Sequence, residues 1–200
     1  MARPRSAGFD DQREQILAAA AQLFATRGYT ASTMNEVAAT CGISKATLYH
    51  YVRDKHGLLA QISAGHVARL EALVAAVAEQ RLGPEAHLRE LIRRFMRAYG
   101  SAEHEHRVLT EDVKFLADAD RQAVLAAQRR VVQAFAEAVA ALRPDLRRAR
   151  LHKPLAMLLF GMINWTFTWL KAGGALNHES LAPVVLALFF GGLPAVPARP

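Results

Sequence analysis

The amino-acid sequence predicts an all-α fold. Apolar residues recur three and four positions apart along all 200 residues, as they do on the buried face of an amphipathic helix. The sequence shows no strict alternation of apolar and polar residues of the kind that marks a half-buried strand. Capping residues before the apolar runs and glycines after them divide the chain into successive helices. The chain is long enough to bury a substantial core.

Three short helices are predicted at the N-terminal end. The first begins at Asp10 or Asp11 and ends before Gly28; one of its faces is apolar, with Ile16, Leu17, Ala20, Leu23 and Phe24. The second begins at Thr33, where Glu36 completes a capping box, and it ends at Gly42. The third runs from Ser44 to about Tyr51. Gly42 lies between them, where a tight turn favours a left-handed residue without a side chain.

The later helices follow the same signals. Asp54 is expected to cap a long fourth helix that reaches Arg81, and Gly83-Pro84 then separates it from the next. Further helices are predicted over 84–99, 101–116, 118–142, 145–171 and 178–190. This organisation predicts an N-terminal domain over 1–53 with a basic arm at 1–8, a second helical domain over 54–193, and a tail over 194–200.

The amino-acid composition narrows the classes of function that this protein can have. Lys and Arg number 25 against 18 Asp and Glu, so the partner is expected to be anionic, either nucleic acid or a membrane surface. The single cysteine, Cys41, excludes an intrachain disulfide framework. Residues 1–8 lack the apolar core of a secretory signal, and the apolar stretch 155–170 is shorter than the roughly 20 residues of a membrane-spanning helix. We therefore expect a cytoplasmic protein without a membrane span.

The segment from Thr33 to Tyr51 carries the clearest functional pattern. Two short helices joined by a tight turn can place the second helix in the major groove of DNA while the first crosses the backbone. The second helix offers exposed polar groups for such contacts at Lys45, Thr47, Tyr49 and His50. The same spacing also fits an ordinary pair of packed helices, so spacing alone leaves both interpretations open.

The residues themselves are more specific than the spacing. The runs Gly28-Tyr29-Thr30-Ala31-Ser32-Thr33-Met34-Asn35-Glu36-Val37-Ala38 and Gly42-Ile43-Ser44-Lys45-Ala46-Thr47-Leu48-Tyr49-His50-Tyr51, followed by Asp54-Lys55, resemble the TetR family of bacterial transcriptional regulators over about residues 9–59. The resemblance implies a homodimeric repressor with an N-terminal helix-turn-helix domain and a C-terminal domain that binds a small inducer. Val52, where the family usually has an aromatic residue, and His56, where it often has an acid, depart from the pattern.

By position in the motif, the resemblance implies a set of DNA-contacting residues. Tyr49 and Lys55 are implied to meet phosphates, and Lys45, Ala46 and His50 to lie nearest the bases. The full set is Thr33, Lys45, Ala46, Thr47, Tyr49, His50 and Lys55. Arg3 and Arg5 would extend a basic arm along the duplex.

The second domain is expected to hold the inducer and the dimer interface. Arg93 and Arg97 could meet a carboxylate or phosphate, and the ligand-lining candidates are Arg93, Phe95, Met96, Arg97, Tyr99, Phe115, Phe135, Met157 and Trp165. The last two helices are unusually apolar, so they are expected to meet other protein. The family resemblance implies that they pair with the same helices of a second copy in a four-helix bundle, through Phe160, Trp169, Leu186, Phe189 and Phe190. Whether Trp165 and Trp169 belong to pocket, core or interface stays open.

The inducer class follows from two further runs. Residues 108–116 and 160–166 resemble the branch of the family that senses fatty or aromatic acyl-CoA thioesters. The cluster Arg143, Arg147, Arg148, Arg150 and Lys153 would suit the phosphates of coenzyme A, although a solvated basic surface explains it as well.

Other functional classes find little support. The sequence contains no nucleophile elbow, phosphate loop or dinucleotide fingerprint, so we expect neither an enzyme nor a cofactor. His104 and His106 lie two residues apart, which does not place them on one helix face, and no metal site is predicted. The main alternative is a helical module that binds acyl ligands or an acidic membrane and never contacts DNA.

Overall fold

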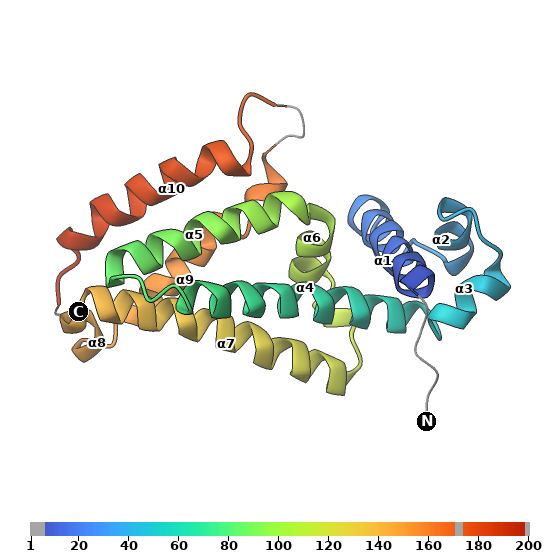
Figure 1. The fold of residues 1–200 in the computed structure, drawn as a ribbon, viewed down its shortest axis with the longest axis horizontal. Helices are drawn as coiled ribbons and strands as arrows, with labels where there is room; N and C mark the ends of the chain where they lie inside the picture. Colours follow the sequence, from blue (N-terminus) through green and yellow to red (C-terminus); the bar gives the residue numbers. More distant parts are fainter. Residues whose placement is uncertain (1–6, 171–173, 199–200) are drawn as a thin grey trace. The chain divides into compact units, whose positions relative to one another are not determined.

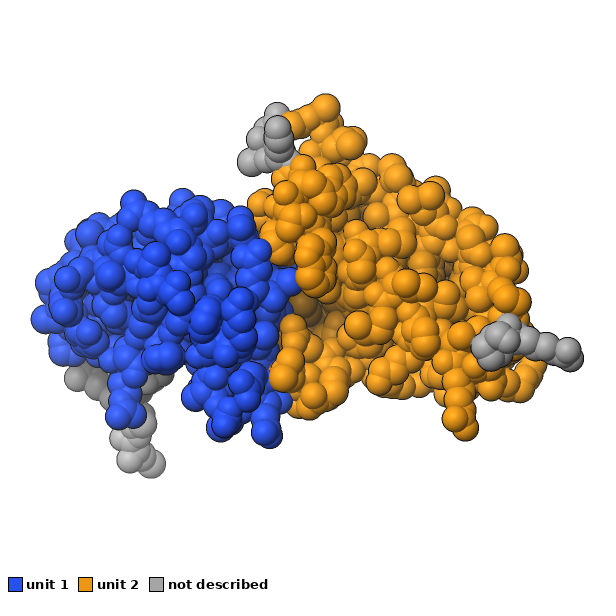
Figure 2. Space-filling model, turned by 180° about the vertical axis from the view of Figure 1, so that it is seen from behind, with its two compact units in different colours: residues 1–66, 104–124 blue, residues 67–103, 125–200 orange. Residues whose placement is uncertain are grey.

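The computed structural model describes residues 7–170 and 174–198, and every regular element within them is helical (Figure 1). Arg3 and Arg5 of the expected basic arm lie outside the described residues. The chain forms two compact units (Figure 2). The first comprises residues 1–66 and 104–124, and the second comprises residues 67–103 and 125–200. The division between the two units falls within the long fourth helix, and the domain boundary after residue 53 stays a prediction.

The first unit contains the predicted short helices. Its elements are α1 (Ala7–Arg27), α2 (Met34–Thr40), α3 (Lys45–Tyr51), the start of α4 (Lys55–Ala78), α6 (Glu103–Glu111), the 3-10 turn η1 (Val113–Phe115) and the start of α7 (Asp118–Leu142). The predicted cap of α1 is wrong, because the helix already begins at Ala7 and so contains Asp10 and Asp11. The predicted boundaries of α7 are confirmed.

Local signals in the sequence set the ends of α1, α2 and α3. Gly28 and Gly42 both have left-handed backbones, with φ angles of 87° and 64°, which glycine adopts without steric cost. The capping box of Thr33 and Glu36 is present, and Ser44 caps α3 by accepting the amide of Thr47. These features confirm the predicted helix–turn–helix.

The second unit is built around one apolar core. It contains α5 (Pro84–Ser101), α8 (Pro144–Arg148), α9 (His152–Ile163), η2 (Thr166–Thr168), α10 (His178–Gly192) and η3 (Leu193–Ala195), with the ends of α4 and α7. An aromatic cluster lies in the core: Phe95 packs against Tyr99, Phe135 and Phe160 with ring centroids 4.8–6.3 Å apart. Helix α10 packs against α5 and α9.

The single helix predicted over 145–171 is wrong. The chain leaves α8 through Arg150, whose φ angle of 60° is incompatible with a continuing helix, and it then restarts as α9. Helix α9 ends at Ile163, where Asn164 accepts a hydrogen bond from the hydroxyl of Tyr99 at 3.0 Å. Apolar periodicity alone does not reveal such breaks.

Helix α10 combines an apolar sequence with a buried inner face. Within the described residues, one helical window, His178–Ala195, is long and apolar enough to cross a membrane. Its inner residues Leu181, Val185 and Phe189 belong to the core of the second unit. Arg143 donates to the carbonyls of Leu193, Pro194 and Val196 and pairs with Asp145, so the start of the predicted tail is held against the protein.

Candidate nucleic-acid interface and ligand groove

Helix α3 presents one polar face to solvent. Lys45, Ala46, Tyr49 and His50 are exposed, with 45% of Tyr49 accessible, whereas Leu48 is fully buried and anchors the helix. In a seven-residue helix this pattern leaves a continuous outer surface of a cation, an aromatic hydroxyl and an imidazole. Such groups can contact phosphate oxygens and base edges when the helix enters a major groove.

Two of the predicted DNA-contacting residues take part in helix capping: Thr33 is the N-cap of α2, and Thr47 is bonded to Ser44, the N-cap of α3. The Thr33 hydroxyl donates to the Glu36 carboxylate at 2.8 Å, and the backbone amide of Glu36 donates to the Thr33 oxygen at 3.3 Å. The Thr47 hydroxyl lies 2.8 Å from that of Ser44. Hydrogen bonding to Thr33, and the pairing with Arg27 at 2.7 Å, lower the pKa of Glu36. Contact of Thr33 and Thr47 with DNA stays a prediction.

Lys55 is placed differently from the other candidates. Its ammonium group donates to the carbonyl oxygens of Tyr29, Thr30 and Ser32 at 2.6, 3.2 and 2.8 Å. It also lies 4.4 Å from the centroid of the Tyr29 ring. The side chain that the family resemblance assigns to phosphate is thus bonded to the turn between α1 and α2.

The two departures from the family pattern have clear structural places. Val52 is buried at the C-terminal end of α3, where its amide donates to the carbonyl of Leu48. The Nδ1 atom of His56 lies 3.1 Å from the Tyr29 hydroxyl. Both residues therefore contribute to packing of the first unit.

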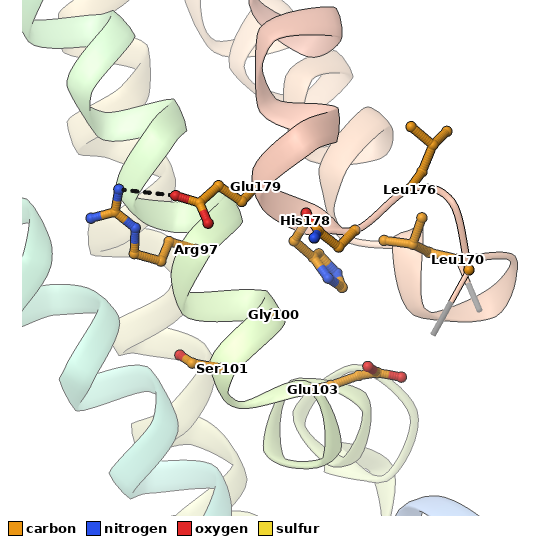
Figure 3. Close-up of a pocket in the computed structure, with 10 residues that line it drawn as sticks. Arg97, Gly100, Ser101, Glu103, Leu170, Leu176, His178 and Glu179 are labelled. Atoms are coloured by element: carbon orange, nitrogen blue, oxygen red, sulfur yellow. Dashed lines mark ion pairs between the residues drawn. The ribbon is translucent and has the colours of Figure 1, made fainter. Parts of the chain in front are cut away.

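A groove in the second unit runs between α5 and α10. A pocket of about 410 Å³ is lined by Arg97, Gly100, Ser101, Glu103, Leu170, Gly174, Leu176, Asn177, His178 and Glu179. Arg97 and Glu179 face each other across it in a loose ion pair of 3.7 Å (Figure 3). A smaller hollow of about 210 Å³ shares these two residues and adds Arg93, Ala182, Pro183 and Leu186. The groove thus has a polar and an apolar part.

His178 forms the buried wall of this groove. The Thr166 hydroxyl donates its one proton to the carbonyl of Ile163 at 2.9 Å, so the His178 Nε2 atom, 3.0 Å away, is the donor in its bond to Thr166. Burial lowers the pKa of His178, and the nearby Glu103 opposes this effect. Burial therefore favours the neutral form of the imidazole.

The structure does not bring the nine ligand-lining candidates together. Arg93 and Arg97 lie on the groove, but Phe95, Met96, Tyr99 and Phe135 are packed in the core. Phe115 belongs to the first unit, where it stacks on Tyr29 at 5.2 Å, and its contact with a ligand stays a prediction. Met157 and Trp165 are exposed. The sequence missed His178 and Glu179, whose only signal was their position directly after the cap Asn177.

The structure also places the dimer-interface candidates in different environments. Phe160, Leu186 and Phe189 lie in the core of one protomer, and Phe190 packs beneath the guanidinium of Arg89 at 4.0 Å. Trp169 is exposed, as is Trp165, so neither is a core residue. These different environments have a geometric reason. Residues two apart on a helix point to different faces, so the inner Leu186 implies that Val184 and Leu188 point outward.

Two exposed apolar stripes result. On α10 the stripe consists of Pro183, Val184, Ala187, Leu188 and Gly191; on α9 and just beyond it consists of Met157, Leu158, Gly161 and Trp165. Both follow the three- and four-residue spacing of one helix face. Leu158 and Leu188 are 66% and 64% exposed, unusually high for leucines in a folded chain.

The first unit holds a buried histidine pair that the sequence did not predict. His66 of α4 and His106 of α6 are both buried, with Nε2 and Nδ1 3.4 Å apart. His106 therefore connects α6 to α4. Among the described residues, no three histidine, cysteine or acidic side chains gather closely enough to hold a metal ion.

Comparison with known proteins gives a consistent result over nearly the whole chain. A family model described as "Bacterial regulatory proteins, tetR family" matches residues 16–62, and "Tetracyclin repressor-like, C-terminal domain" matches residues 81–193. The HTH-type transcriptional repressor KstR2 of Mycolicibacterium smegmatis is 26% identical over 193 residues, covering 91% of this chain and 90% of that protein.

Solved structures of related regulators share the fold of this chain and part of its sequence. A TetR-family regulator from Bordetella parapertussis is 31% identical, with a TM-score of 0.85, and the match covers 92% of this chain and 97% of the other. AibR, solved in complex with isovaleryl coenzyme A and operator DNA, is 25% identical, with a TM-score of 0.76 and coverage of 88% and 97%. Together with the capped helix–turn–helix and its polar outer face, these matches show that the chain belongs to the TetR family of bacterial transcriptional regulators.

Proposed function

We propose that this protein is a homodimeric repressor that reads a palindromic operator with α3 and leaves it when a small hydrophobic acid or acyl thioester binds. The observation that carries DNA reading is the exposed row Lys45, Tyr49 and His50 on a helix anchored by Leu48. Phosphate contacts would set the register of the helix in the groove, and base contacts would select sequence.

The exposed stripes on α9 and α10 support the dimer. The outer faces of α9 and α10 leave Leu158 and Leu188 exposed to water. If the same faces of a second copy covered them, this apolar surface would leave water and the dimer would be stabilised. Such a contact is twofold symmetric, and two reading helices related by a twofold axis require two inverted half-sites.

The groove between α5 and α10 supports an anionic, partly apolar ligand. Arg93 and Arg97 offer guanidinium donors beside the apolar surface of Ala182, Pro183 and Leu186. The loose Arg97–Glu179 pair is exposed on both sides, so an incoming carboxylate or phosphate can replace it at small cost. A hundredfold loss of operator affinity needs about 2.7 kcal/mol of differential binding, which about 100 Å² of additional apolar burial would supply.

Operator selection followed by ligand titration tests the proposal. We expect the purified dimer to enrich an inverted repeat from a random-sequence duplex pool and to bind it with strong salt dependence. Isovaleryl-CoA, the ligand of AibR, is the first inducer to titrate, with free coenzyme A and isovalerate as controls. Enrichment of no sequence, with binding to vesicles of anionic lipid instead, would favour a membrane-binding module and refute DNA reading.

The proposal includes cytoplasmic location and no catalytic activity. Membership in a family of DNA-binding regulators supports both, because such a protein must share a compartment with DNA and its ligand need only bind.

A further inference from the structure

The ammonium group of Lys55 has a complete set of partners inside the first unit. An ammonium has three N–H donors, and the carbonyl oxygens of Tyr29, Thr30 and Ser32 lie at 2.6, 3.2 and 2.8 Å from Nζ. The Tyr29 ring closes a further side at 4.4 Å. Lys55 is half-buried, so these bonds are only partly shared with water.

The three carbonyls belong to one short segment with a defined task. Residues 29–32 connect Gly28, which ends α1, to Thr33, which caps α2. Lys55 itself lies in the first turn of α4, directly after α3. One side chain therefore ties the segment before α2 to the helix after α3, so both ends of the helix–turn–helix are fixed to each other.

Other contacts also stabilise residues 29–32, in addition to the bonds of Lys55. The Ser32 hydroxyl donates to the carbonyl of Gly28 at 2.9 Å, and the Tyr29 ring stacks on Phe115 at 5.2 Å. These contacts hold the segment to α1 and η1. Residues 29–32 are linked to α4 by the bonds of Lys55 and by the Tyr29–His56 contact of 3.1 Å.

We propose that Lys55 is a positioning residue for DNA reading: it sets the orientation of α2 and α3 relative to α4 and leaves phosphate contact to the exposed residues of α3. To reach a phosphate, Nζ would have to give up all three bonds. The Tyr29 carbonyl would keep the amide of Ser32 at 3.3 Å, whereas the carbonyl of the buried Ser32 would lose its bond from Lys55. The inference rests on the DNA binding proposed above, and it differs from the phosphate role that the family resemblance implies for this position.

The two roles predict different patterns of DNA affinity. A phosphate contact contributes equally to every sequence, and its removal lowers the slope of log affinity against log salt by about one. A positioning residue contributes only where α3 must fit a particular sequence. Lys55→Met should therefore weaken binding to the selected operator at least about tenfold. Affinity for a random-sequence duplex, and its salt slope, should stay within about twofold of wild type.

Tyr49→Phe is the matched control, because Tyr49 is exposed on α3 and is the other residue that the family resemblance assigns to phosphate. It should weaken binding to both duplexes by the same factor, since phosphate contacts carry no sequence information. Equal losses on operator and random duplex for Lys55→Met, with the reduced slope, would overturn the positioning role. Failure of the wild-type protein to bind any duplex would instead refute the proposed function.

A neutral donor provides the second test. The amide of Gln donates hydrogen bonds to carbonyls without charge, so Lys55→Gln should recover part of the operator affinity that Lys55→Met loses. Hydrogen exchange should show faster exchange at residues 30–33 in Lys55→Met than in Lys55→Gln. If Lys55→Met does not melt cooperatively, the test rests on Lys55→Gln alone. A loss of affinity for the operator only supports the positioning role of Lys55, and an equal loss of affinity for both duplexes contradicts it.

Discussion

Asp112 is a buried carboxyl whose ionisation opposes folding. Only 8% of the residue is exposed, and burial, with the neighbouring Glu111, raises its pKa from 3.8 to about 6. Lys114, Arg107 and Lys55 oppose this shift without cancelling it. Asp112 follows α6 and precedes Phe115. The free-energy cost of ionising Asp112 therefore destabilises the segment whose Phe115 packs against Tyr29.

The sign of the resulting pH dependence follows from proton counting. Between pH 4 and pH 6 the folded protein holds a proton on Asp112 that the unfolded chain has released, so stability falls as the pH rises through this range. We expect Asp112→Asn to raise the free energy of unfolding at pH 7 by about 1–2 kcal/mol. Urea unfolding at pH 4.5 and pH 7 checks this, and a variant as pH-dependent as wild type would contradict it.

At the scale of elements, the turn between α2 and α3 depends on Gly42. Its φ angle of 64° places an added side chain in the left-handed region. We expect Gly42→Val to destabilise the first unit by about 1–2 kcal/mol and to reduce operator affinity accordingly. Gly42→Asn is the control, because asparagine tolerates this conformation better. Thermal melts and gel shifts of both variants measure the effect, and equal behaviour of Val and Asn would refute the turn argument.

The packing of α5 against α10 depends on a second glycine for another reason. A Cβ atom at Gly100 would lie 3.0 Å from the Cβ atom of His178, which is held in place through its bond to Thr166. The missing side chain therefore lets the two helices approach closely and shapes the wall of the groove.

We expect Gly100→Ala to lower the free energy of unfolding by about 1–3 kcal/mol, because α10 must shift outward. Gly8→Ala in α1 is the control, since nothing lies within 4 Å of its Cβ position, and it should be neutral or slightly stabilising. Chemical denaturation compares the two variants. A Gly100→Ala protein as stable as wild type would show that α10 adjusts freely.

At the scale of the whole molecule, the outer faces of α9 and α10 decide assembly. Leu158 and Leu188 are each about two-thirds exposed in the single chain, whereas Leu186 and Phe189 on the same helix pair are buried. The inner faces thus stabilise the protomer and the outer faces remain for a partner.

We expect the double variant Leu158→Glu, Leu188→Glu to be a folded monomer at micromolar concentration, because the carboxylates would be desolvated in a dimer. Light scattering measures the mass. Operator affinity should fall by at least about a hundredfold, since each head then binds one half-site alone. Leu82→Glu, which changes an exposed leucine outside both stripes, should remain dimeric. A dimeric double variant would place the interface elsewhere.

The amino-acid sequence was enough to predict the all-α fold, the helix–turn–helix with its caps at Thr33 and Ser44 and its turn at Gly42, and the family. These features depend on residues within a few positions of one another, where spacing and backbone preference act directly. The tertiary structure was needed to find the partners of Lys55, the burial of Leu186 and Phe189, and the pairing of Arg97 with Glu179. In each case the deciding atoms lie far apart in the chain or depend on the rotation of a helix about its axis, and local periodicity carries no information about which distant group a side chain meets.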